Sequence, residues 1–592
     1  MSVKLSWLFP KKLVSLLFSL ESLDARISPP KDPRMRQKIS MAAGKPRWNT
    51  LEFKLYYLLF VVIVMMILVT AYRATNPPNP NYYKFESLLS EGWLFGRKVD
   101  NSDTQYRFFR DNLFLLLVFM AAQIFIKKLV IHIFPINKGT FDLYFGIAFL
   151  FVIHGVNSLR ILLHFFAMYG IAKLLKQQKN VALVLSWIYG IGTLVFNNRY
   201  RAFPFGDIIP IASFLDKSYK GVVERWDVFF NVSLLRMLSF NFDFIERWNA
   251  VHAAQTSTTP TLYEEDGSSP KVEDLKLSSI PSPGVADSVE FLDERARLIA
   301  PHKIDDYNIK NYFAYINYTP LFIAGPIITF NDYLYQTTHQ LPSITPSRVF
   351  YYSLNIMCCI LTMEFILHFL YVVAASKAKA WTGTPFEVSM IGFFNLNIIW
   401  LKLLIPWRIF RLWALIDGID PPENMIRCVD NNYSTMAFWR AWHRSFNKWV
   451  LRYIYIPLGG SSNRILTSLA VFSFVAIWHD IELRLLFWGW MIVLFLLPEL
   501  LATRYCAKYS KEKWFRHLCA FGAALNIWMM MIVNIFGFCL GYDGTIQFLK
   551  DLLGTFRGVL FFILATCSFF IAVQLMFEQR EHEKRNGINV RC

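Results

Sequence analysis

Residues 465–502 read ILTSLAVFSFVAIWHDIELRLLFWGWMIVLFLLPELLA, two apolar runs joined by a short polar segment. The first run, Ile465 to Trp478, would rise about 21 Å as a helix, which is less than the roughly 30 Å hydrocarbon core of a bilayer. A helix that begins at the membrane surface would therefore place His479 deep in the bilayer, where a polar side chain is costly unless it has a function. The alternative is a helical hairpin whose loop reaches water, with His479 as an ordinary loop residue.

The same apolar character extends over the whole chain. Of its 592 residues, 55% are hydrophobic and 17% are aromatic. Several apolar runs are shorter than a full span or contain Asn, Arg or His, which favours tilted or re-entrant helices around a polar interior. The sequence predicts an all-α polytopic membrane protein, a bundle of about 10–12 transmembrane and re-entrant helices. The candidate spans are residues 55–72, 112–128, 141–156, 158–173, 181–197, 313–330, 349–375, 387–405, 465–479, 483–503, 518–541 and 557–577.

The chain divides into a tail and a membrane domain. Residues 1–48 form a basic tail in which leucines recur at helical spacing, as in a helix that lies on the membrane surface. Residues 49–592 form the membrane domain, and residues 250–290 within it have the Ser-, Thr-, Pro- and acid-rich composition of a disordered polar loop. The net charge is +18, but the basic residues flank apolar runs, so nucleic-acid binding is not expected.

Residues 438–449, FWRAWHRSFNKW, form the most informative segment upstream of His479. Drawn as one helix, the segment separates aromatic side chains from cations, and His443 and Asn447 lie at the boundary between the two faces. Such a helix fits the membrane surface, where aromatic rings enter the bilayer and cations meet phosphates. Two interpretations stay open: a surface anchor with an incidental histidine, or an acyl-CoA site with His443 turned inward. The cations are Arg440, Arg444, Lys448 and Arg452, and the aromatic face contains Trp439, Trp442, Phe446, Trp449, Val450 and Tyr453.

Residues 438–449, the run RYIYIPLGG at 452–460 and the later Trp478-His479-Asp480 resemble motifs of the membrane-bound O-acyltransferases. The resemblance is closer to the family's yeast glycerol-uptake branch, which implies acyl transfer in the remodelling of glycosylphosphatidylinositol (GPI) anchors. It implies that His479 is the catalytic base and that His443 occupies a second catalytic position, which members fill with His, Asn or Asp. The candidate substrate-binding residues are Arg440, Trp442, Arg444, Asn447, Lys448, Trp478 and Asp480.

The same resemblance implies the substrates and the location. Acyl-CoA would be the acyl donor, and a lyso-GPI lipid or a GPI-anchored protein would be the acceptor. The expected location is the endoplasmic reticulum membrane, or also the plasma membrane. No metal site is expected and no cofactor is expected to be required. Cys428, fifteen residues before His443, resembles the haem-ligating cysteine of the hedgehog-acyltransferase branch.

Two other functions remain open on the sequence. Glu364 and His368 are four residues apart in an apolar run, a spacing that would let a glycerol or proton transporter relay protons. The same pair could instead be a buried hydrogen-bonded contact that fixes helix packing or lines a substrate tunnel. The chain shows no internal repeat, which many transporters have. Transfer of the acyl group to a protein is the second alternative, because the motifs also resemble the hedgehog-acyltransferase branch.

Overall fold

The computed structural model describes residues 19–223, 225–256, 292–299, 302–380 and 383–590. Ten helical segments of this described part are long and apolar enough to cross a membrane, which confirms an all-α polytopic membrane protein. Strands in the described part are limited to a two-stranded antiparallel pair, β1 (Ser90–Glu91) and β2 (Lys98–Val99). Three of the four leucines expected in a surface helix, Leu13, Leu16 and Leu17, lie outside the described residues, as does most of the 250–290 loop. The fourth, Leu20, is the first residue of α2 (Leu20–Leu23).

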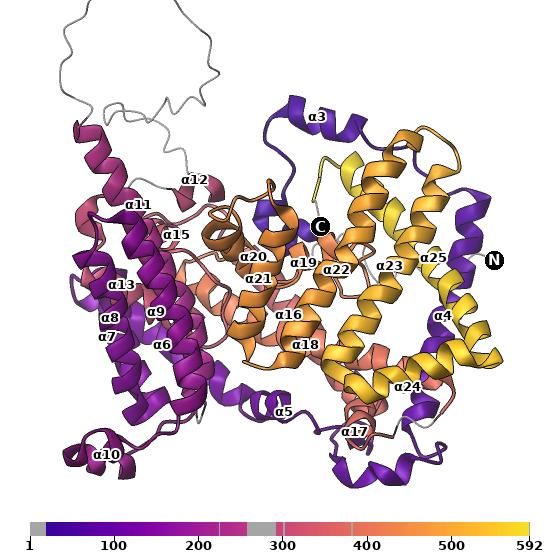
Figure 1. Cartoon of the computed structure of the whole chain (residues 1–592), viewed down its shortest axis with the longest axis horizontal. Helices are drawn as coiled ribbons and strands as arrows, with labels where there is room; N and C mark the ends of the chain where they lie inside the picture. The colour runs from indigo at the N-terminus through magenta and orange to yellow at the C-terminus, as the bar shows by residue number, and fades with distance from the viewer. Residues whose placement is uncertain (1–18, 224, 257–291, 300–301, 381–382, 591–592) are drawn as a thin grey trace, which may run out of the picture.

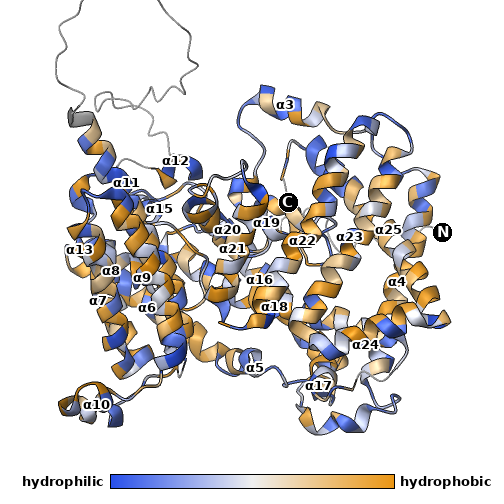
Figure 2. Cartoon of the chain, in the orientation of Figure 1, coloured by the Kyte–Doolittle hydropathy of each residue, from blue (hydrophilic) through white to orange (hydrophobic). Residues whose placement is uncertain are grey.

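The helices form two groups on either side of a central helix, α18 (Figure 1). One group packs around α11 and the other around α4 and α25, and α18 contacts α4, α6, α16, α23 and α25. Hydrophobic residues dominate the long helices, and hydrophilic residues gather at their ends and in the connections (Figure 2). The first group contains α6 (Leu113–Ile133), α7 (Lys138–His154), α8 (Ser158–Leu174), α9 (Lys179–Tyr200), α10 (Phe205–Ile208), α11 (Trp226–Thr256), α12 (Glu294–Leu298), α13 (Ile309–Ile316), α14 (Thr319–Phe322) and α15 (Phe330–Thr338).

The second group and the central elements complete the bundle (Figure 1). The amino-terminal elements are α2 (Leu20–Leu23), the 3-10 turn η2 (Ala25–Ile27), α3 (Pro33–Met41), α4 (Leu51–Thr75) and α5 (Thr104–Asp111). The central elements are α16 (Pro346–Phe369), α17 (Val372–Lys377), α18 (Pro385–Asp417), α19 (Thr435–Ala441), α20 (Arg444–Val450), the π-helix η8 (Leu451–Tyr455), α21 (Arg464–His479) and α22 (Leu483–Cys506). The carboxyl-terminal helices are α23 (Phe515–Ile535), the π-helix η10 (Phe536–Leu540), α24 (Gly541–Gly554) and α25 (Phe556–Arg585).

Two expectations about spans were wrong, and one arginine explains both. Residues 313–330 are not a span: they contain the end of α13, all of α14 and a loop, and these short helices are buried in the protein. The structure instead places a span at α11, which the sequence analysis had missed because this helix carries Arg236 and other polar residues. The buried Arg236 guanidinium donates to the carbonyl oxygens of Ile316, at 2.7 Å, and Leu321. It therefore satisfies carbonyl groups of α13 and α14 inside the bilayer, as buried backbone requires.

Candidate active site

A large cavity opens between α18, the α19–α20 segment, α21 and α22. Its volume is about 1540 Å³, and α4, α11, α23 and α25 also contribute to its walls. Most of its lining is apolar, with a small number of polar side chains, as in sites that bind ligands with long hydrocarbon parts. Both histidines singled out from the sequence, His443 and His479, line this cavity.

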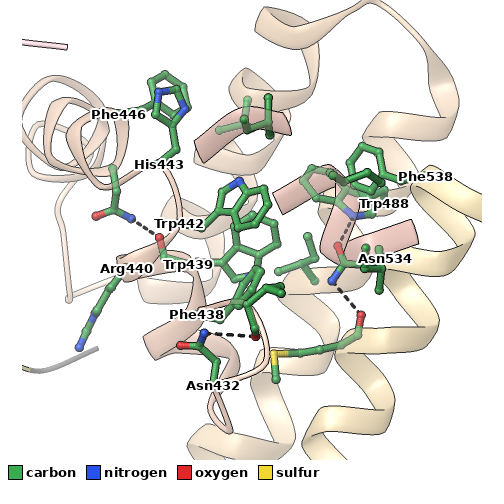
Figure 3. A pocket seen from close by; sticks show the side chains of 18 of the residues that line it. Asn432, Phe438, Trp439, Arg440, Trp442, His443, Phe446, Trp488, Asn534 and Phe538 are labelled. Carbon is green, nitrogen blue, oxygen red and sulfur yellow. Dashed lines mark hydrogen bonds between the residues drawn. The ribbon is translucent and has the colours of Figure 1, made fainter. Parts of the chain in front are cut away.

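His443 lies at a break between two helices. The expectation of one continuous helix over 438–449 was wrong, because α19 ends at Ala441 and α20 begins at Arg444. His443 has φ 44° and ψ 52°, the left-handed conformation that few residues other than Gly adopt, with Asn, Asp and His the main exceptions. The break reorients the chain, so the faces drawn on a single helix do not hold. Figure 3 shows His443 beside Phe446, apart from the Phe438, Trp439 and Trp442 rings.

Aromatic rings hold the imidazole of His443 in place. Trp407 of α18 stacks on it with a ring-centre distance of 4.4 Å, and Phe446 lies at 5.1 Å on nearly parallel planes. Burial, together with repulsion from His479 when both rings are protonated, lowers the pKa of His443 to about 3. The ring is therefore neutral at physiological pH and carries one N–H donor and one acceptor nitrogen.

His479 is the last residue of α21, and its side chain is exposed to the cavity. The short segment 480–482 then leads into α22, so α21 and α22 form a helical hairpin. Trp478 fixes the end of α21: its indole N–H donates to the carbonyl of Asn231 at 2.9 Å, and the Asn231 amide donates back to the Trp478 carbonyl at 2.8 Å. The hairpin thus orients His479 toward the cavity rather than leaving it as a free loop residue.

The four cations Arg440, Arg444, Lys448 and Arg452, called the basic stripe below, do not form one surface. Arg444 bonds the buried carboxylate of Asp24 at 2.6 Å, and Lys448 pairs with Glu294. Arg452 pairs with Asp243 at 2.9 Å. The expected contribution of Arg444 and Lys448 to a phosphate site disagrees with this geometry, because both cations are neutralised by carboxylates and neither lines the cavity.

Asp24 shows why the amino-terminal segment packs against the membrane domain. It is fully buried and also bonds Arg26 of η2 at 3.2 Å. Burial alone would raise the pKa of Asp24. The pKa nevertheless lies well below its ordinary value because Arg26, Arg444 and Arg411 surround the carboxylate. Sequence reasoning missed this partner, since nothing local links residue 24 to residue 444.

The remaining predicted binding residues line the cavity. Arg440 is exposed and also borders a second cavity of about 490 Å³ near the carboxyl terminus. In Figure 3 its side chain points away from the aromatic cluster. Asn447 lines the cavity and donates to the Trp439 carbonyl at 3.1 Å, and Asp480 accepts from the backbone N–H of Ile481. Trp442 and Trp478 supply aromatic walls.

Cys428, the expected haem ligand, is a free cysteine. Its side chain is partly accessible, yet the surrounding protein and the nearby Asp430 carboxylate raise the pKa of the thiol to about 12. A haem iron takes a thiolate, and a bound metal ion itself deprotonates a coordinating thiol, so the pKa of the free thiol does not decide the question. Haem ligation by Cys428 therefore stays a prediction.

Glu364 and His368 form a buried structural contact. Arg110 binds both carboxylate oxygens of Glu364 at 2.6 Å, and the Trp93 indole donates to the same group at 2.9 Å. His368 Nδ1 lies 2.7 Å from the Glu364 carbonyl oxygen. This arrangement matches the packing interpretation and leaves no open carboxylate for a proton relay.

Comparisons with known proteins identify the family of the chain. Residues 181–542 match the model of the membrane-bound O-acyltransferase family. The chain is 58% identical to the membrane-bound O-acyltransferase GUP1 of Saccharomyces cerevisiae, over 98% of this chain and 99% of that protein. It is 48% identical to GUP2 of the same yeast, over 97% and 98% of the two chains. A more distant similarity, 28% identity over 28% of this chain and 35% of the other, links it to the mouse protein-cysteine N-palmitoyltransferase HHAT. The chain therefore belongs to the membrane-bound O-acyltransferase family and is an acyltransferase of the membrane.

Proposed function

We propose that the protein transfers a long or very long acyl chain from acyl-CoA to a hydroxyl group of a lyso-GPI anchor, in the endoplasmic reticulum membrane. The observation that carries the acyl-transfer chemistry is the shared cavity of His443 and His479. Its volume of about 1540 Å³ exceeds the roughly 300–1,000 Å³ of ordinary small-molecule sites and suits a long hydrocarbon chain. The choice of acceptor is supported by the resemblance of the two motifs to the GPI-remodelling branch.

In this mechanism His479 is the general base. A ring nitrogen of His479 takes the proton from the acceptor hydroxyl while the oxygen attacks the thioester carbonyl. The carbonyl π electrons move to oxygen and return as the C–S bond breaks, and the departing thiolate receives the proton from the His479 imidazolium. One ester bond forms, one thioester bond breaks, and the base returns to its neutral state.

His443 has a different part in the same step. Because its ring is neutral, it donates a single N–H to the developing oxyanion or to the attacking oxygen. The stacked Trp407 and Phe446 rings hold this donor in one orientation before substrate binds. A fixed donor is effective because it needs no reorganisation as charge develops.

Among Arg440, Arg444, Lys448 and Arg452, Arg440 is the one that lines the cavity. It is exposed on the cavity wall, whereas Arg444 and Lys448 are paired with Asp24 and Glu294. A guanidinium forms charge-assisted hydrogen bonds with phosphate oxygens. We therefore assign the CoA phosphates to Arg440 in place of the full basic stripe.

The test is acylation by the purified full-length protein with labelled acyl-CoA and lyso-GPI. Wild type should form acylated GPI, His479→Ala should not, and His132→Ala, which changes an exposed histidine of α6, should behave like wild type. Membranes that lack the protein should accumulate lyso-GPI. If anchors stay fully acylated while glycerol flux falls at once, the enzyme proposal fails in favour of a transporter. Transfer only to a protein acceptor would assign the second alternative.

A further inference from the structure

The connection between α18 and α19 carries a carboxylate that the reaction described above does not use. Asp430 lines the large cavity, and its side chain is exposed there. It accepts a hydrogen bond from Asn397 of α18 at 3.4 Å. In the described part of the chain, no lysine or arginine forms an ion pair with it. A carboxylate inside the apolar cavity of a membrane protein is costly unless it serves a ligand.

A second acceptor lies beside it. Asn432 is only 8% exposed and lines the same cavity. Its amide nitrogen donates to the carbonyl oxygens of Cys428, at 3.0 Å, and Val429, at 3.4 Å. These two carbonyls fix which end of the amide is nitrogen, so the free end is the oxygen. That oxygen has no hydrogen-bond partner within the described residues, and Figure 3 shows the amide with its nitrogen turned to the main chain.

The two groups share one chemical requirement. A carboxylate and an amide oxygen both accept hydrogen bonds, and neither offers a proton to a ligand. A primary ammonium has three donors and a positive charge, so its chemistry suits both groups. Desolvation by the surrounding protein raises the pKa of Asp430 to about 7, and a bound cation would restore the charged carboxylate.

We propose that Asp430 and Asn432 bind a primary ammonium group on the headgroup of the acyl acceptor and so select acceptors that carry a free amine. This inference rests on the proposed function, because it assigns a further contact to the acceptor of that reaction.

The position of the pair also sets a spacing. Asn397, which contacts Asp430, and Trp407, which stacks on His443, are ten residues apart on α18. At 1.5 Å per residue, that separation is about 15 Å along the helix. Asp430 and His443 therefore contact α18 at levels that are about 15 Å apart along its axis.

A binding experiment tests the inference separately from activity. The probes are lysophosphatidylethanolamine, which carries a primary amine, and its N-acetylated form, titrated into the full-length protein in detergent micelles. Wild type should bind the amine at least about tenfold more tightly, as expected for a hydrogen-bonded charge pair. Asp430→Asn should bind the two probes equally. Asp430→Ser should do the same, and both variants should keep the wild-type melting temperature.

Glu482→Gln is the matched control, because Glu482 is another carboxylate on the cavity wall but is paired with Arg484 at 3.3 Å. This variant should keep the preference for the amine. Equal or undetectable binding of the two probes to wild type, or a preference that survives Asp430→Asn, would overturn the inference. Failure to acylate lyso-GPI would instead overturn the proposed acceptor and leave the binding comparison unaffected.

Discussion

Replacing each cavity histidine separately should distinguish the base from the donor. His479→Ala removes the group that accepts the hydroxyl proton, and general-base catalysis typically contributes about 10²–10⁴-fold. We expect kcat near background, with protein level and acyl-CoA binding almost unchanged, because the His479 side chain is exposed to the cavity. His443→Asn keeps a hydrogen-bond donor at the same place and should retain partial activity.

His443→Ala removes the ring and also strains the backbone, so its effect on activity must be compared with that of His443→Gly. In the left-handed conformation with φ 44°, Ala carries a cost of about 1–2 kcal/mol that Gly does not. His443→Ala should therefore be less stable than His443→Gly by about 1–2 kcal/mol. Both variants lack the ring, and both should lose roughly 10²–10³-fold in kcat, the usual effect of removing one oxyanion donor.

The assay is single-acceptor turnover with labelled acyl-CoA, together with denaturant unfolding of each purified variant. The expected order of kcat is wild type, then His443→Asn, then His443→Ala and His443→Gly together. If His443→Gly recovers wild-type kcat, the ring has no catalytic part and the loss in His443→Ala was backbone strain. An inactive His443→Asn beside an active His479→Ala would exchange the two roles, and normal acylation by both alanine variants would refute this reading of the cavity.

Three further outcomes follow from the same geometry. Arg440→Ala should raise the KM for acyl-CoA without changing the free energy of unfolding. Arg444→Ala should instead lower the free energy of unfolding by about 3–5 kcal/mol, because buried Asp24 loses one partner, and the double variant with Asp24→Asn should recover part of this loss. A destabilised Arg440→Ala together with a raised KM in Arg444→Ala would refute the assignment. The pKa of His443 is about 3 in the folded protein and about 6.5 in the unfolded chain. Acidification from pH 6.5 to 5 should therefore lower the free energy of unfolding of wild type by up to about 2 kcal/mol more than that of His443→Asn. Free energies of unfolding that fall in parallel for the two proteins would contradict this. If Cys428 ligates haem, reconstitution with haemin should give a Soret band that Cys428→Ala abolishes, and a sample without a Soret band would refute this ligand.

The apolar pattern predicted most of the spans but failed where polarity is buried. No candidate span covered α11, whose apolar run is interrupted by Arg236, Asn241 and Asp243. All three side chains are buried, and Arg236 satisfies the carbonyls of short helices that no window of 20 residues could resolve. A hydropathy pattern measures exposure to lipid, so it misses a span whose polar face meets other protein.

The site was predictable to the extent that its chemistry is local. The motifs identified His443 and His479, and the structure places both on one cavity. Long-range partners were out of reach: Asp24 neutralises Arg444 from 420 residues away, and Trp407 stacks on His443 from another helix. Periodicity treated residues 438–449 as an uninterrupted helix because the sequence contains no Gly or Pro there to signal a break.

That break gives a physical reason for the residue types at position 443. A histidine at φ 44° occupies a backbone conformation in which Asn, Asp and His are the main non-glycine residues. The family motif resembled by residues 438–449 accepts the same three types at its second catalytic position. In the proposed mechanism each of them also offers a polar side chain to the reacting oxygen atoms, whereas glycine would fit the backbone and lose the chemistry. We infer that the backbone turn limits the choice to these side chains and that catalysis excludes glycine from it.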